Sequence, residues 1–188
     1  MKTKKISTSR KTSRRRALLV LVAAFALAVL RPAIAAGEDP QQVVEKITGR
    51  VIEVLANDSL PTAKKRSQVQ DIVYDWVDFE TMSRLVLARN WKRLSDAQQK
   101  EFVEQFRQHL SNTYGKNVDS YRDEKVTILG TRDEARGDVT VKTTIVRGGP
   151  GDIFVDYRLR KIGGEWRIID VVIERVSLVS NFRSQFQE

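Results

Sequence analysis

Few side chains in this sequence are of the types that perform catalysis. His109 is the only histidine and the chain has no cysteine, so neither a zinc site nor thiol chemistry is predicted. His109 lies beside the apolar stripe of a predicted helix, which is typical of a surface or boundary histidine. Asp75, Asp78 and Glu80 are close in sequence, but helix capping and solvation explain them better than paired acid–base catalysis. We therefore expect no metal, no cofactor and no catalytic residue.

Asp170 is the exception, because it stands in an apolar stretch, WRIIDVVI (166–173). A buried carboxylate is costly unless it is paired or hydrogen-bonded. One interpretation is a hydrogen bond with the Tyr157 hydroxyl or with an arginine. The other is a polar anchor at the mouth of a pocket, or a base inside it. The base would make the protein an enzyme acting on a small apolar molecule in a cone-shaped pocket.

The elements that position Asp170 form two halves, a helical part at 39–120 and a sheet at 124–175, followed by a C-terminal segment, 177–188. The predicted helix starts are Asp39-Pro40, Pro61, Asp78 and the capping box Ser95 to Gln98. Each helix carries one apolar stripe, so the helices should share an interior. The later half alternates with period two, which predicts four antiparallel strands joined by short turns. The fold class is therefore α+β.

The register of the last hairpin predicts which residues share a face. If Gly163-Gly164 is a two-residue loop, Leu159 faces Ile168, Tyr157 faces Asp170, and Val155 faces Val172. The face that carries these apolar side chains should meet the helices. The opposite face is more polar and should be half-covered, with the C-terminal segment as the candidate cover.

Charge is concentrated at the N-terminus. The net charge is +9, but residues 1–35 hold nine basic residues and no acidic one, leaving 24 basic against 24 acidic residues in the remainder. A body with no basic surplus disfavours nucleic-acid binding. The basic stretch, the apolar run at 17–30 and small residues at Ala33 and Ala35 together predict a cleavable signal peptide, 1–35, with a membrane anchor as the alternative. SRRRALL (13–19) leaves the twin-arginine route open beside the Sec route.

Two blocks of sequence resemble the MlaC family, also called the toluene-tolerance auxiliary family. The first spans 77–121 and the second, which contains VDYRLRK and VSLVSNFRSQF, spans 155–186. The first block's matching positions are Asp78, Phe79, Met82, Leu85, Val86, Leu87, Trp91, Ser95, Gln98, Phe102, Phe106, Leu110, Thr113 and Tyr114. One departure is Arg175, where the family commonly has Gly. Relatives also usually continue in a helical tail beyond Glu188, so we expect either closure without that tail or an incomplete chain.

The resemblance implies a periplasmic carrier, without enzymatic activity, that holds phospholipid acyl chains between a twisted antiparallel sheet and a layer of helices. Residues 36–188 would form this single lipid-binding domain. Its implied partners are the MCE-domain protein of an inner-membrane ABC transporter and an outer-membrane lipoprotein–porin complex. Contact with these membrane complexes would be transient, and the carrier would be a monomer that maintains outer-membrane lipid asymmetry.

The cavity lining follows from the face assignment above rather than from the family. The expected lipid-binding residues are Met82, Leu85, Val86, Phe102, Phe106, Tyr114, Val141, Ile145, Val155, Tyr157, Leu159, Ile168, Val172 and Leu178. An interaction module with a completely filled interior is the remaining alternative.

Overall fold

A computed structural model describes residues 38–147 and 151–186 of the chain. The chain divides into two units, Met1–Ala36 and Gly37–Glu188, and the predicted signal peptide lies outside the described residues. None of the helices in the described part combines the length and the apolar character needed to cross a membrane.

The helices begin where the capping residues predict. They are α2 (Pro40–Leu55), α3 (Thr62–Trp76), α4 (Phe79–Leu87), α5 (Asp96–Tyr114) and α6 (Leu178–Gln185), with the 3-10 helices η1 (Ala88–Arg93), η2 (Gly115–Ser120) and η3 (Ala135–Gly137). Asp39 and Ser95 each form a complete capping box, and the Asp78 side chain accepts a hydrogen bond from the Thr81 amide at 2.8 Å. The cap side chains accept hydrogen bonds from amides that have no partner within the helix, so the positions of the cap residues predict where these helices start.

The strands form one antiparallel sheet in the order β1-β2-β3-β4-β5. They are β1 (Lys125–Asp133), β2 (Val139–Val146), β3 (Ile153–Ile162), β4 (Glu165–Ile173) and β5 (Val176–Ser177). The predicted α+β class and meander are confirmed, with five strands instead of four. The fifth was missed because it has two residues, too few for a period-two pattern. It forms because Glu174 and Arg175 both take positive φ values, 49° and 69°, and turn the chain back.

A β-bulge changes the register of the β3–β4 hairpin. Leu159 pairs with Ile168 as predicted, but Arg158 pairs with Asp170 and Tyr157 pairs with Val171, so Ile169 is the extra residue. The predicted pairing is therefore wrong beyond Ile168. A slip of one residue moves every later side chain to the other face of the sheet.

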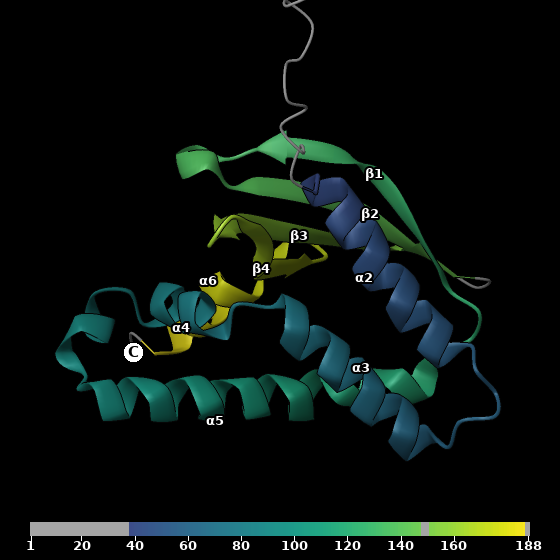
Figure 1. The fold of residues 1–188 in the computed structure, drawn as a ribbon, viewed down its shortest axis with the longest axis horizontal. Coiled ribbons are helices and arrows are strands. Elements are labelled where there is room, and N and C mark those ends of the chain that lie inside the picture. Colours follow the sequence, from purple (N-terminus) through teal and green to yellow (C-terminus); the bar gives the residue numbers. More distant parts are fainter. Residues whose placement is uncertain (1–37, 148–150, 187–188) are drawn as a thin grey trace, which may run out of the picture. The chain divides into compact units, whose positions relative to one another are not determined.

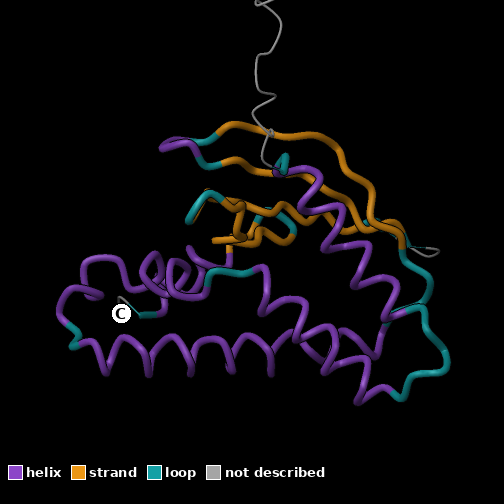
Figure 2. The backbone as a smooth tube through the Cα atoms, viewed as in Figure 1, coloured by secondary structure: helices purple, strands orange, loops and turns teal. Residues whose placement is uncertain are grey.

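The helices cover the sheet unevenly, as Figures 1 and 2 show. Helix α2 crosses β1 and β2, and α3 packs against α2 and η2. Helix α6 lies between α4 and β4, so the C-terminal segment joins the helical layer to the sheet.

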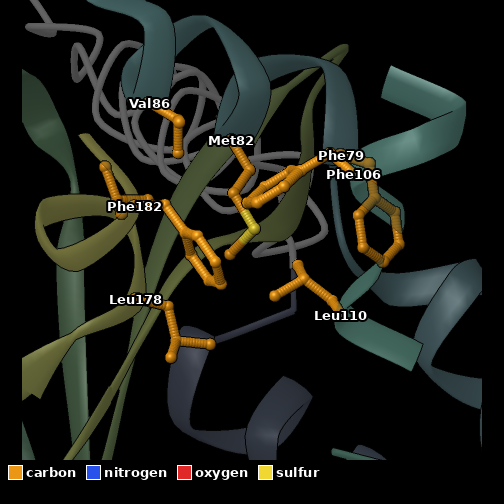
Figure 3. Close-up of a cluster of buried hydrophobic side chains, with 8 residues drawn as sticks. Phe79, Met82, Val86, Phe106, Leu110, Leu178 and Phe182 are labelled. Atoms are coloured by element: carbon orange, nitrogen blue, oxygen red, sulfur yellow. The ribbon is translucent and has the colours of Figure 1, made fainter. Parts of the chain in front are cut away.

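The apolar interior consists of two clusters. The first joins α4, α5 and α6 through Phe79, Met82, Val86, Phe106, Leu110, Leu178, Val179 and Phe182 (Figure 3). The second joins α2, α3 and the sheet through Val43, Val44, Ile47, Ile72, Val141, Leu159 and Ile168. The face of the sheet that carries Leu159 and Ile168 is called the inner face below.

Candidate functional site

The candidate site is the apolar region between the two clusters. Val77 and Val171 are the two side chains that pack against both clusters, and each is only half-buried. Ile173 and Tyr157 are also half-buried, although each packs against one of the clusters. Core residues in close-packed interiors are normally fully buried. Accessible apolar surface among core residues is therefore what a hydrophobic ligand could cover.

The structure brings most of the predicted lining residues to this region. Those in or against the first cluster are Met82, Leu85, Val86, Phe102, Phe106, Tyr114 and Leu178. Those in or against the second are Val141, Tyr157, Leu159 and Ile168. Val155 and Ile145 share the inner face by register but belong to neither cluster.

Val172 does not belong to this set. Because of the bulge at Ile169, Val172 pairs with Asp156 and Ser177 on the opposite face of the sheet. Val171 and Ile173 occupy the inner face instead. Sequence reasoning missed both, since strict alternation from Ile168 points them away from the helices.

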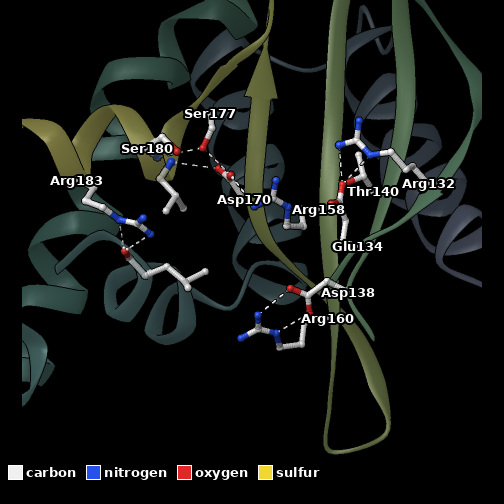
Figure 4. Close-up of polar contacts among 12 residues, drawn as sticks. Arg132, Glu134, Asp138, Thr140, Arg158, Arg160, Asp170, Ser177, Ser180 and Arg183 are labelled. Carbon is white, nitrogen blue, oxygen red and sulfur yellow. Dashed lines mark hydrogen bonds and ion pairs between the residues drawn. The ribbon is translucent and has the colours of Figure 1, made fainter. Parts of the chain in front are cut away.

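Asp170 is also carried to the opposite face, where it anchors α6 (Figure 4). Its carboxylate accepts hydrogen bonds from the Ser177 hydroxyl at 2.6 Å and from the Val179 amide at 3.1 Å. The Arg158 guanidinium lies 3.8 Å away, and Asp170 is 1% exposed. The predicted hydrogen bonds with Tyr157 and with an arginine are therefore both wrong, because Arg158 is close enough for an ion pair but not for a hydrogen bond.

These contacts also decide against a base inside the pocket. Both carboxylate oxygens of Asp170 already accept hydrogen bonds from the β5–α6 segment, and the residue faces away from the inner side chains. A general base must reach a substrate proton within hydrogen-bonding distance. Asp170 has no such access to the inner face.

Tyr157 occupies the middle strand of the inner face. It pairs with Val141 on one side and Val171 on the other, and its side chain packs against the second cluster. Burial raises the pKa of the Tyr157 hydroxyl to about 12. No side chain of the described residues forms a hydrogen bond with this hydroxyl.

Polar contacts stabilise the sheet outside this region. Asp138 is buried and accepts two hydrogen bonds from the Arg160 guanidinium, both at 2.7 Å (Figure 4). Hydrogen bonding from Thr140, and then from Arg132, lowers the pKa of the Glu134 carboxyl. These pairs fix the β1–β2 end of the sheet without entering the apolar clusters.

Two hollows of about 490 Å³ and 600 Å³ lie along α2 and α3. Arg50 and Asp75 line both, and the larger one extends to Trp76 and Trp166. Polar and charged side chains make up most of the lining of both hollows, so neither is the apolar cavity that the sequence predicts. The described residues contain no group of three or more acidic or histidine side chains placed to hold a metal ion.

The family follows from comparison with known proteins. The model of the MlaC protein family matches residues 45–188. The chain belongs to the MlaC family. A Pseudomonas putida member, toluene tolerance protein ttg2D, is 28% identical over 182 residues, which cover 93% of this chain and 81% of the relative.

A solved structure supports the fold assigned to this MlaC-family chain. It is a phospholipid-binding protein from Ralstonia solanacearum, solved at 1.53 Å in complex with a phospholipid. The match has a TM-score of 0.71 at 23% identity and covers 80% of this chain and 86% of the other. The helix-plus-sheet architecture is therefore shared by the two proteins.

Proposed function

We propose that this chain binds phospholipid, with acyl chains between the inner face of the sheet and the helical layer. The observation that carries the proposal is the half-buried apolar surface where the two clusters meet, at Val77 and Val171, with half-buried Ile173 beside the first cluster. Membership of the MlaC family, together with a fold shared with a phospholipid-binding protein, supports the same ligand class.

The energetics suit a carrier. Exposing an acyl chain to water costs about 0.8 kcal/mol per methylene, so two chains of about 15 methylenes cost roughly 20 kcal/mol. An apolar interior offsets much of this cost. The net affinity is far smaller, since ordering the ligand and desolvating its polar groups oppose binding. Release then depends on a partner that favours an opened state of the protein.

The biological role we propose is transport rather than catalysis. The carrier is a periplasmic monomer that moves phospholipid between an outer-membrane lipoprotein–porin complex and the MCE-domain protein of an inner-membrane ABC transporter. This transport maintains the lipid asymmetry of the outer membrane. The neutral charge of residues 36–188 limits adhesion to anionic membrane surfaces during transit. The placement of Asp170 weighs against the enzymatic alternative.

Two neighbouring valines provide a matched test of the ligand site. Val171 lies on the inner face and Val172 on the opposite face, and both are half-buried. We expect Val171→Trp to fill the proposed lipid space and to reduce the phospholipid extracted per folded protein at least several-fold. Val172→Trp should leave it unchanged. Circular dichroism monitors folding, and mass spectrometry of organic extracts measures the lipid.

The outcome can contradict the proposal in two ways. If the wild-type protein carries no phospholipid after purification from cells, lipid binding is refuted. Equal lipid content in the Val171→Trp and Val172→Trp proteins would refute this location for the site. Transport is tested separately, by transfer of a fluorescent phospholipid from the loaded protein to proteoliposomes that contain the MCE-domain complex.

A further inference from the structure

The inner face carries one phenol whose environment points to a specific ligand group. Tyr157 lies on the central strand of the sheet, and its side chain packs against the second cluster. The residue remains half-buried, so part of its surface is accessible, yet the surrounding protein raises the pKa of its hydroxyl to about 12. Tyr157 therefore presents accessible surface on the inner face of the sheet, where a ligand could cover it.

The hydroxyl is a hydrogen-bond donor without a protein acceptor. No described residue accepts a hydrogen bond from it, and Asp170, the acceptor expected from the sequence, lies on the other face. The hydroxyl is not among the fully buried polar atoms that lack a partner, so water can reach it until a ligand covers this surface. A hydroxyl that is buried without a hydrogen bond is costly. A ligand that covers the adjacent apolar surface must therefore either supply an acceptor or leave the donor unpaired.

The surroundings indicate that this acceptor is neutral. Burial accounts for the raised pKa of the Tyr157 hydroxyl. Val141 and Val171 flank it across the sheet. The cation on the same face of β3 is Lys161, four residues along the strand or roughly 13 Å away. A phosphate placed at Tyr157 would lose its hydration without gaining a counter-charge.

We infer that the Tyr157 hydroxyl donates a hydrogen bond to an ester carbonyl of the bound phospholipid. This inference rests on the proposed function and deepens it. The ester group is the neutral acceptor that joins the acyl chains to the charged headgroup. Its capture at Tyr157 fixes how deeply the chains enter, and it selects ester-linked lipids over ether-linked lipids.

The test is a competition between two lipids that differ only in their two ester carbonyls. Delipidated full-chain protein is equilibrated with equal amounts of dipalmitoyl phosphatidylcholine and its dihexadecyl ether analogue, and the bound lipids are quantified by mass spectrometry. We expect the wild-type protein to favour the ester lipid by about 2- to 12-fold, the ratio given by one neutral hydrogen bond.

Tyr157→Phe keeps the ring and removes the donor, so total occupancy should persist while the ester-to-ether ratio falls to about one. Tyr121→Phe is the matched control, since Tyr121 directly follows η2, is also half-buried and belongs to neither cluster, and its ratio should equal that of the wild type. A wild-type ratio near one, or a preference retained in Tyr157→Phe, overturns the inference and leaves lipid binding intact. Wild-type protein that binds neither lipid overturns both proposals.

Discussion

The contacts of Asp170 predict that it holds the C-terminal helix in place and takes no part in ligand chemistry. The perturbation is Asp170→Ala. It removes the acceptor of the Ser177 hydroxyl, at 2.6 Å, and of the Val179 amide, at 3.1 Å, while the amide stays buried and the hydroxyl stays partly buried. The Ser177 hydroxyl in turn caps α6 by accepting the Ser180 amide at 3.0 Å. Loss of Asp170 therefore loosens the start of the helix at two points.

The magnitude follows from the number and type of these bonds. A hydrogen bond to a charged group contributes about 1.5–3 kcal/mol, and Asp170 accepts two in a site where it is 1% exposed. Arg158, at 3.8 Å, adds an unpaired charge once the carboxylate is gone. We expect a loss of about 3–5 kcal/mol of unfolding free energy. For a domain of this size, that lowers the melting temperature by about 6–20 °C.

The assay is thermal unfolding followed by circular dichroism, with hydrogen exchange to localise the change. Exchange should accelerate first in α6 and β5. Asp156→Ala is the matched control, because Asp156 lies on the same face one strand away, is half-buried and makes no hydrogen bond or ion pair through its side chain with a described residue. Its melting temperature should change by 2 °C or less.

Two results would refute this reasoning. The first is an Asp170→Ala protein whose melting temperature matches that of Asp156→Ala. The second is a stable Asp170→Ala protein that has lost ligand at 4 °C, because this would give Asp170 a direct part in binding.

Three further predictions concern the sheet. Thr143→Val removes a 2.6 Å hydrogen bond to the Val155 carbonyl and should lower the free energy of unfolding in urea by about 1 kcal/mol. Thr144→Val replaces a buried hydroxyl that has no described partner, so it should leave this free energy unchanged or raise it. Equal losses in the two variants would contradict this prediction. Arg175→Gly should raise the melting temperature by about 1–3 °C, because φ is 69° at this position and glycine takes such a left-handed conformation without the strain that arginine has. An unchanged or lower melting temperature would show that Arg175 is not strained. Thr140→Val should raise the pKa of Glu134, measured by NMR titration. A carboxyl whose pKa is lowered in the folded state stabilises the protein above its unfolded pKa, so the stability advantage of the wild type over Thr140→Val should shrink as pH falls below about 5. A stability difference between the two proteins that does not change with pH would refute the coupling.

The helical half was largely predictable because its determinants are local. Asp39, Asp78 and Ser95 start helices through side-chain bonds to amides within three residues. The stripe on α5 that includes Phe106 and Leu110 packs into the first cluster as its spacing predicts. Such interactions depend on the sequence a few residues away, so the sequence by itself determined them.

The site depended on a feature that only the tertiary structure decided. Two glycines fix the β3–β4 turn, and the pairing of Leu159 with Ile168 follows from them. The bulge at Ile169 has no such local signal. It places Asp170 within reach of the amide of Val179 in α6, and it turns Val171 toward the interior. Alternation alone cannot reveal such a switch, because the energy that favours it comes from contacts between β4 and a helix that begins eight residues after Asp170.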